Sequence, residues 1–418
     1  MQLGIKILKN IYIIGAGLAG LSASVHGVER NYKVNIFESS NLIGGRCRSF
    51  FDKKMGQEID NGNHLVFSAN KNFYELCKIV RSLDSLQLLP FDLDFYDKKR
   101  SFYWNLNLEN INFSKILMNH IELIPGSHLS DYLSIFKFLF AKENSTVYEL
   151  IGDSNIYKTF WDPLTLAVMN TSCENASAKV LAYVLKETIL KGKKNCSIYQ
   201  PKVNWNESVI KPCVNFLKKK GCEINLKNIL KSIKIHNNVI TRLQFLNNSI
   251  DIKENDLVIF AIPPSNFSKF FPNLSLPKNY NSIVNVHFKL TKTIKDKFSK
   301  KIIGFINSYT HWLFIKENYL SVTISNANHL NNLDSEEIAN IIWVEICSYM
   351  KIKHRIPSFQ VVKEKKATLE QSPSNFSLVR KLTELPNNVR ISGDWTQTSL
   401  PCTIEGSILS GKKAIPYL

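Results

Sequence analysis

The sequence has no long apolar run, no paired cysteines and no clustered metal ligands. Although 44% of its 418 residues are hydrophobic, no stretch of the ~18 apolar residues that a transmembrane helix needs is present. None of the eight cysteines falls in a Cys-x-x-Cys pair, and the nine histidines are dispersed. These absences predict no metal site and favour a reducing, cytoplasmic location.

Negative charge is also scarce, since 53 Lys and Arg residues face 35 Asp and Glu residues, giving a net charge of +18. No zinc finger, helix-turn-helix or aromatic RNA-binding signature accompanies the scattered lysines, so no nucleic-acid partner is predicted. The charge instead suits peripheral contact with an anionic membrane surface, such as the inner face of the cell membrane. The length allows two domains.

The most informative stretch reads as strand, glycine-rich turn, helix and strand. The apolar run Ile11–Ile14 predicts a buried parallel strand, residues 18–30 predict a helix, and Val34–Phe37 predict the next strand. Between the first strand and the helix lies a G-x-G-x-x-G turn that predicts a dinucleotide site, with these candidate contact residues: Gly15, Ala16, Gly17, Ala19 and Gly20.

Each part of this turn has a physical role in binding a dinucleotide. Gly15 permits the tight turn, Gly17 lets a pyrophosphate approach the backbone, and Gly20 lets the helix pack against the strand. The helix directs its free N–H groups at the phosphates. Glu38 ends the second strand at close to the ~20 residues beyond the turn expected for the acid that binds the ribose.

A second glycine turn, Gly44-Gly45-Arg46, follows Glu38 closely. It resembles the FAD-binding segment of the amine oxidase and phytoene desaturase superfamily, so FAD is favoured over NAD. Two glycines give an open turn beside the pyrophosphate, and the arginine offers N–H donors to phosphate oxygens. The resemblance implies an α/β fold, in which a Rossmann-like FAD-binding domain of the glutathione reductase type is interleaved with an α+β substrate domain.

We expect the chain to pass repeatedly between these two domains. Residues 1–89, 206–266 and 381–418 are assigned to the FAD-binding domain, and residues 90–205 and 267–380 to the substrate domain. Residues 65–89 are expected to be helical, and the resemblance places Leu230 where the backbone holds the adenine. A run from Tyr132 to Phe140 is apolar nearly all round, which favours a buried helix, a tunnel wall or a membrane-dipping helix.

Three further stretches, Asp60–His64, Trp161–Thr171 and Gly393–Gly406, resemble the hydroxysqualene dehydroxylase family in particular. The resemblance implies flavin contacts from these residues: Gly62, Asn63, His64, Gly393, Asp394, Thr403, Ile404 and Glu405. The last three open a C-terminal helix whose positive end would face the electron-rich edge of the flavin. Asn63 stands where glutamine is expected in many relatives.

The resemblance implies that reduced FAD converts hydroxysqualene to squalene with loss of water. Such chemistry requires a proton donor and a dry tunnel for the long isoprenoid. His64 is the first candidate donor and Asp60 the second, although His64 in a merely structural role is an equal alternative. FAD must be reduced by an external electron donor that the sequence does not identify, because no second dinucleotide motif provides a bound nicotinamide site.

Two other enzyme classes share these motifs. A phytoene-type desaturase would use the same fold to oxidise a long isoprenoid, and an amine or protoporphyrinogen oxidase would use oxygen with a polar or aromatic substrate. A non-enzymatic FAD-binding scaffold is the remaining alternative.

Overall fold

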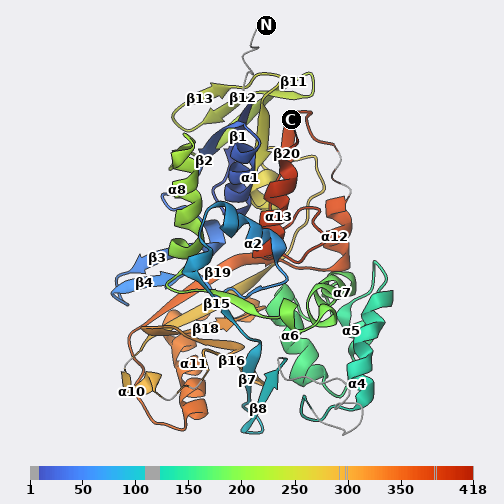
Figure 1. Cartoon of the computed structure of the whole chain (residues 1–418), viewed down its shortest axis with the longest axis vertical. Helices are drawn as coiled ribbons and strands as arrows, with labels where there is room; N and C mark the ends of the chain where they lie inside the picture. Colours follow the sequence, from blue (N-terminus) through green and yellow to red (C-terminus); the bar gives the residue numbers. More distant parts are fainter. Residues whose placement is uncertain are drawn as a thin grey trace.

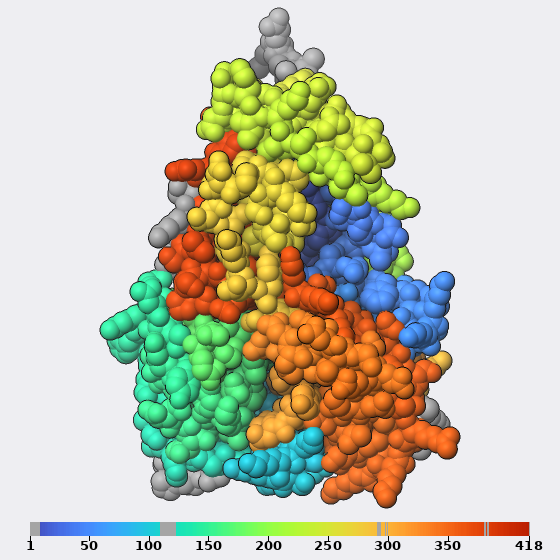
Figure 2. Space-filling model, turned by 180° about the vertical axis from the view of Figure 1, so that it is seen from behind, coloured from blue at the N-terminus to red at the C-terminus, as the bar shows by residue number. Residues whose placement is uncertain are grey.

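The structure is a computed structural model that describes residues 9–417 except 109–122, 291, 297, 299, 381 and 383. A parallel sheet with its helices forms the upper body, and a larger mixed sheet with helices on both sides forms the lower body (Figure 1). The long strands β19 (Phe359–Leu369) and β15 (Tyr280–Lys289) form the edge of the lower sheet that lies next to the upper body. Figure 2 shows the same arrangement from behind, with the teal and green helical layer at the lower left.

The upper sheet has five strands, paired in parallel throughout. Their order across the sheet is β10 (Glu223–Asn225), β2 (Lys33–Phe37), β1 (Asn10–Ile14), β14 (Leu257–Phe260) and β20 (Val389–Ile391). Three separate stretches of the chain therefore build one sheet. The domain boundaries themselves stay a prediction, and parts of the first two segments, residues 1–8 and 109–122, lie outside the described residues.

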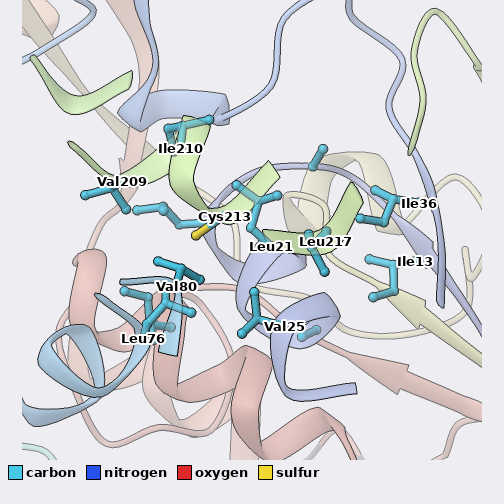
Figure 3. Close-up of a cluster of buried hydrophobic side chains, with 14 of the residues drawn as sticks. Ile13, Leu21, Val25, Ile36, Leu76, Val80, Val209, Ile210, Cys213 and Leu217 are labelled. Carbon is cyan, nitrogen blue, oxygen red and sulfur yellow. The ribbon is translucent and has the colours of Figure 1, made fainter. Parts of the chain in front are cut away.

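Helices cover the faces of this sheet because the strands are apolar on both sides. The covering helices are α1 (Leu18–Glu29), α2 (Lys71–Ile79), α8 (Lys211–Lys219) and α13 (Ile404–Ala414). Leu21 and Val25 of α1 pack with Leu76 of α2 and Leu217 of α8 in one fully buried cluster (Figure 3). This packing confirms the predicted strand–helix–strand unit at the start of the chain.

A small antiparallel sheet closes the top of the upper body. It consists of β11 (Leu230–His236), β12 (Val239–Phe245) and β13 (Ser249–Asp251). Phe245 stacks on Phe37 at the end of β2, with 4.6 Å between the ring centroids. This contact brings the start of β11 beside the strand end that carries Glu38.

The lower sheet has seven strands. Their order is β19 (Phe359–Leu369), β15 (Tyr280–Lys289), β18 (Tyr319–Ile324), β17 (Trp312–Ile315), β16 (Ile302–Ile306), β7 (Asp92–Asp97) and β8 (Phe102–Asn107). Only β16 and β7 pair in parallel among these strands. Helix α11 (Ser335–Met350) buries one face of the sheet.

A helical layer lies beside the lower sheet (Figure 1). Its helices are α4 (Leu129–Leu133), α5 (Val147–Ile151), α6 (Asp162–Met169) and α7 (Ala178–Glu187). Helix α6 begins at Asp162 with Pro163 in its first turn, as expected from the Pro preference for that position. The remaining helices and the hairpin before Asp60 are short: α9 (Pro264–Phe267), α10 (Lys292–Lys295), α12 (Pro373–Arg380), β3 (Ser49–Asp52) and β4 (Gln57–Asp60).

Two sequence predictions of local structure are wrong. The expected helix at residues 65–89 is interrupted: β5 (Val66–Phe67) and β6 (Leu86–Leu89) flank helix α2 and both pair with β9 (Ile198–Pro201). Arg81 ends the helical path in a left-handed conformation, with φ of 59°. Pairing with a distant strand has overridden the local helical pattern.

The apolar run from Tyr132 to Phe140 is not a buried helix. Most of it forms a 3-10 segment, Ser134–Phe140, in which Phe138 is buried. Phe136 and Phe140 instead point outward and are 43% and 82% exposed. Among the described residues no helix is both long and apolar enough to cross a membrane.

Candidate active site

The turn between β1 and α1 leaves room for a phosphate where Gly17 lies. A Cβ on Gly15, whose φ is +106°, would lie 2.4 Å from the carbonyl oxygen of Ala261, and one on Gly20 would lie 2.0 Å from that of Gly15. A Cβ on Gly17 would meet nothing closer than 4.0 Å. The turn is therefore tightly packed beneath and open above, at the N-terminus of a twelve-residue helix, as a pyrophosphate site requires.

The second glycine turn lies directly against the first. The Gly44 amide donates a hydrogen bond of 2.9 Å to the Ala16 carbonyl, and Gly44 forms a parallel bridge with Gly17. A Cβ on Gly45 would lie 3.2 Å from the Cα of Gly17. The two turns therefore form one cradle, and any larger side chain at these positions would fill it.

Glu38 holds a negative charge at the edge of this cradle. One carboxylate oxygen accepts a hydrogen bond from the Ala16 amide at 2.8 Å, and the other accepts from the Ser40 amide at 2.8 Å. These bonds fix the carboxylate in the wall of the cavity, where it retains lone pairs for further donors. The arrangement fits the predicted ribose acid.

A single cavity of about 880 Å³ runs from the cradle into the lower body. It is lined by most of the residues expected to contact the cofactor: Gly15, Gly17, Ala19, Glu38, Gly44, Gly45, Arg46, Gly62, Asn63, His64, Leu230, Gly393, Asp394, Thr403, Ile404 and Glu405. Ala16, Gly20 and Asp60 do not line it. The structure thus brings together residues from both ends of the chain.

The Arg46 guanidinium contacts two protein groups in the cavity wall. Its Nη2 lies 2.8 Å from Asp394 Oδ1, and it also donates to the Ala367 carbonyl. A guanidinium has five N–H donors, and these contacts use two of them, so the expectation that Arg46 also donates to phosphate oxygens stays a prediction. Arg46 and Asp394 form an ion pair in the cavity wall.

The Glu405 carboxylate is likewise used within the protein. It caps helix α2, accepting hydrogen bonds from the Asn72 amide at 3.0 Å and the Phe73 amide at 2.9 Å. Thr403 caps helix α13, with its hydroxyl accepting from the Gly406 amide. Two helix N-termini therefore meet at the cavity, which stabilises negative charge there.

His64 and Asp60 occupy different positions with respect to the cavity. His64 lines it, whereas Asp60 is 1% exposed and lies behind the wall. Asp60 Oδ1 accepts from Ser49 at 2.7 Å and from the Trp205 amide at 3.1 Å, and its Oδ2 lies 3.5 Å from Lys316 Nζ. This geometry suits Asp60 for organising the wall rather than for touching a substrate.

Burial lowers the pKa of His64 to about 4, although the nearby Asp60 charge and a hydrogen bond to the Arg46 backbone act in the opposite direction. The imidazole is therefore neutral near pH 7 in this state. Its Nε2 is buried and has no hydrogen-bonding partner among the described residues.

The lower part of the cavity is mainly apolar. Its walls come from the sheet, from the segment after His64 and from α6, through these side chains: Leu65, Phe67, Phe91, Leu93, Leu164, Trp312 and Phe314. Two polar residues, Asn285 and Thr323, also line it and were not predicted as site residues. The sequence signal that could have indicated Asn285 and Thr323 was the presence of polar side chains at alternate positions of β15 and β18.

The chain matches the family described as flavin containing amine oxidoreductase over residues 18–414. It belongs to this family, a class of flavin-dependent oxidoreductases, and the double glycine cradle with Glu38 at its edge agrees with that membership.

Within the family the chain is similar to curated hydroxysqualene dehydroxylases. It is 34% identical to the enzyme of Zymomonas mobilis, covering 96% of this chain and 97% of the relative. It is 31% identical to the enzyme of Sinorhizobium fredii, covering 97% of each. A zeta-carotene desaturase of Synechococcus elongatus is 23% identical over 63% of this chain.

Solved structures show the same fold at low identity. A putrescine oxidase superposes with a TM-score of 0.73 at 12% identity, over 97% of this chain and 98% of the other. A putative protoporphyrinogen oxidase from Exiguobacterium superposes with a TM-score of 0.70 at 11% identity, over 97% of each chain. These likenesses confirm the predicted fold class.

Replacing Glu38 by Ala should weaken FAD binding by about 1–3 kcal/mol, because ribose hydroxyls would lose a charged acceptor. Titration of the flavin-free protein with FAD measures the effect. Glu58→Ala, on the neighbouring hairpin and absent from the cavity lining, is the control. Equal FAD affinity in Glu38→Ala and the native protein would show that Glu38 is not the ribose acid.

Acid should destabilise the fold partly through His64. Between its ordinary pKa near 6.5 and the folded value of about 4, the unfolded chain binds a proton that the folded chain does not. The free energy of unfolding therefore falls as the pH is lowered through this window, by roughly 2 kcal/mol at pH 5 for this group.

Denaturant unfolding at pH 7 and pH 5 measures this loss. His64→Gln should lose less stability between the two pH values than the native protein, and His236→Gln, on the exposed end of β11, is the matched control. An identical pH dependence in His64→Gln and the native protein would contradict the assignment.

Proposed function

We propose that the chain is an FAD-dependent hydroxysqualene dehydroxylase, which reduces hydroxysqualene to squalene. Identity of 31–34% to curated enzymes of that name, over nearly the whole of each chain, supports this proposal. The observation that carries it is the single cavity that joins the glycine cradle to an apolar chamber. A dinucleotide and a long hydrocarbon chain would meet inside one water-poor space.

The described residues fit FAD. Gly17, Gly44 and Gly45 leave a cradle that a Cβ would fill, and Glu38 at its edge would bind the ribose hydroxyls. When bound and reduced, FAD supplies the two electrons that replace the substrate's hydroxyl by hydrogen. The aromatic and aliphatic walls exclude water, which would otherwise recapture the allylic cation left by the departing hydroxyl.

We also propose His64 as the proton donor, because it lines the cavity and Asp60 does not. Since its pKa is about 4 in the described state, donation near pH 7 requires negative charge in the loaded cavity to raise that pKa. The Asp60 carboxylate behind the wall already acts in this direction.

Turnover under anaerobic conditions tests the activity. Protein whose FAD has been photoreduced should be reoxidised by hydroxysqualene and should yield squalene. His64→Gln should keep its FAD but react on the order of a hundredfold more slowly, the usual scale of lost general acid catalysis. Full activity in this variant would leave Asp60 or a bound water as the donor.

The same protein preparation distinguishes the proposed dehydroxylase from the main alternative, a phytoene-type desaturase. A phytoene-type desaturase would reduce its oxidised FAD with phytoene and ignore hydroxysqualene. That result would overturn the dehydroxylase proposal and leave the fold and the flavin site unaffected.

We further propose a cytoplasmic protein that binds peripherally to the inner face of the cell membrane, where a water-insoluble substrate resides. Residues 129–140, here called the apolar edge, expose Leu133, Phe136, Leu139 and Phe140. The net charge of +18 favours an anionic surface, and none of the eight cysteines forms a disulfide, as in a reducing compartment.

Replacing Phe136 and Phe140 together by Ser should weaken binding to vesicles with anionic lipids by roughly tenfold or more, because two large apolar side chains no longer leave water. High salt should reduce binding of the native protein without abolishing it. Leu246→Ser is the control: it is also exposed but lies between β12 and β13, strands at the opposite end of the molecule (Figure 1). Vesicle binding unchanged in the double variant would contradict a role for the apolar edge.

A further inference from the structure

The inner face of the lower sheet, opposite α11, has a polar and an apolar zone. Strands β15 and β18 turn aliphatic and aromatic side chains to α11 and place polar ones at the alternate positions between them, including Asn285, His287, Ser321 and Thr323. On the neighbouring strand β17, the same face carries Trp312 and Phe314. The cavity crosses the boundary, since Asn285, Thr323 and both aromatic residues line it.

The polar zone is held together by hydrogen bonds that include Asn63 from the opposite wall. Asn63 Nδ2 donates to Ser321 Oγ at 2.7 Å and to Thr323 Oγ1 at 3.0 Å. The Thr323 hydroxyl in turn donates to Asn285 Oδ1 at 2.8 Å. Asn285 Nδ2 then donates to the Asn61 carbonyl at 3.2 Å. Thr323 therefore fixes the orientation of both amides.

Within the two amides, Asn63 and Asn285, these bonds leave one acceptor and one donor unused among the described residues. The two N–H groups of Asn63 are engaged, but its Oδ1 is buried and accepts nothing. Asn285 Nδ2 carries two N–H groups, of which one reaches the Asn61 carbonyl. A hydroxyl group matches this pair, because it can donate to the first amide and accept from the second, whereas a hydrocarbon can do neither.

We propose that Asn63 and Asn285 bind the hydroxyl of the substrate, and that Thr323 positions their amides. The inference rests on the proposed function and deepens it: the polar zone selects an isoprenoid alcohol, and the apolar zone around Trp312 and Phe314 receives its chain. Selection operates by the cost of leaving buried amide groups unpaired when a plain hydrocarbon occupies the cavity. Product squalene, which lacks the hydroxyl, is thereby released in favour of new substrate.

Competitive binding of hydroxysqualene and squalene to the FAD-loaded oxidised protein tests the proposal, with the flavin absorption spectrum as the signal. The native protein should prefer hydroxysqualene by ~10- to 100-fold, the range for buried polar groups left without partners. Asn285→Leu, of similar size, should bring that preference close to unity while FAD content and squalene affinity are kept. Thr323→Val, which removes only the positioning hydroxyl, should lower the preference in part.

Phe314→Leu is the matched control from the apolar zone, and it should weaken the binding of both ligands by the same factor.

A native protein that binds both ligands equally while still turning over hydroxysqualene would overturn the hydroxyl site and leave the proposed function standing. Full preference retained in both Asn285→Leu and Thr323→Val would overturn it as well. Loss of FAD from Asn285→Leu with the preference intact would assign Asn285 to the cofactor. Failure of the native protein to bind or convert either ligand would overturn the proposed function and this inference together.

Discussion

The shape of the cavity depends on glycine positions, where the absence of a side chain allows two stretches of backbone to contact each other directly. Gly20 lies so close to Gly15 that no Cβ fits between them, and the Gly44 amide bonds to the Ala16 carbonyl of the same turn. At the other end of the chain, a Cβ on Gly411 would lie 2.4 Å from the Ala19 carbonyl. These close approaches bring two distant segments, at Gly44 and Gly411, to the start of α1 and leave the space above Gly17 open.

Polar side chains then join the segments that the glycines bring together. The ion pair between Arg46 and Asp394 joins the second glycine turn to the C-terminal segment, and Glu405 joins α13 to the N-terminus of α2. Charge-assisted bonds of this kind are worth more inside a protein than on its surface because solvent competes less for them. The same residues that the family resemblance assigned to the cofactor therefore also stabilise the shape of its site.

The sequence allows prediction of the structural features that neighbouring residues determine. The β1–α1–β2 unit and the acid at Glu38 follow from periodicity and spacing, and the structure contains them. Residues 65–89 were mispredicted because β5 and β6 pair with the distant strand β9, whose register no local pattern reveals. Asn285 and Thr323 alternate with apolar neighbours as any half-buried strand would. Their importance emerges only when the sheet places them opposite Asn63.

A polar zone inside an apolar cavity is costly unless its groups bond to one another, because every buried unpaired amide loses its hydration. Here most polar groups of the zone bond to other protein groups, while Asn63 Oδ1 and His287 Nε2 are buried without a partner among the described residues. His287, fully buried, lies 2.9 Å from Ser321 through Nδ1, and burial lowers its pKa to about 4, so it adds no charge near pH 7. The zone can therefore recognise a single hydroxyl without bringing in ions or water, which would react with a carbocation. The hydrogen-bonded polar zone therefore binds the alcohol group and the aromatic walls bind the hydrocarbon chain, so one cavity holds both parts of the substrate.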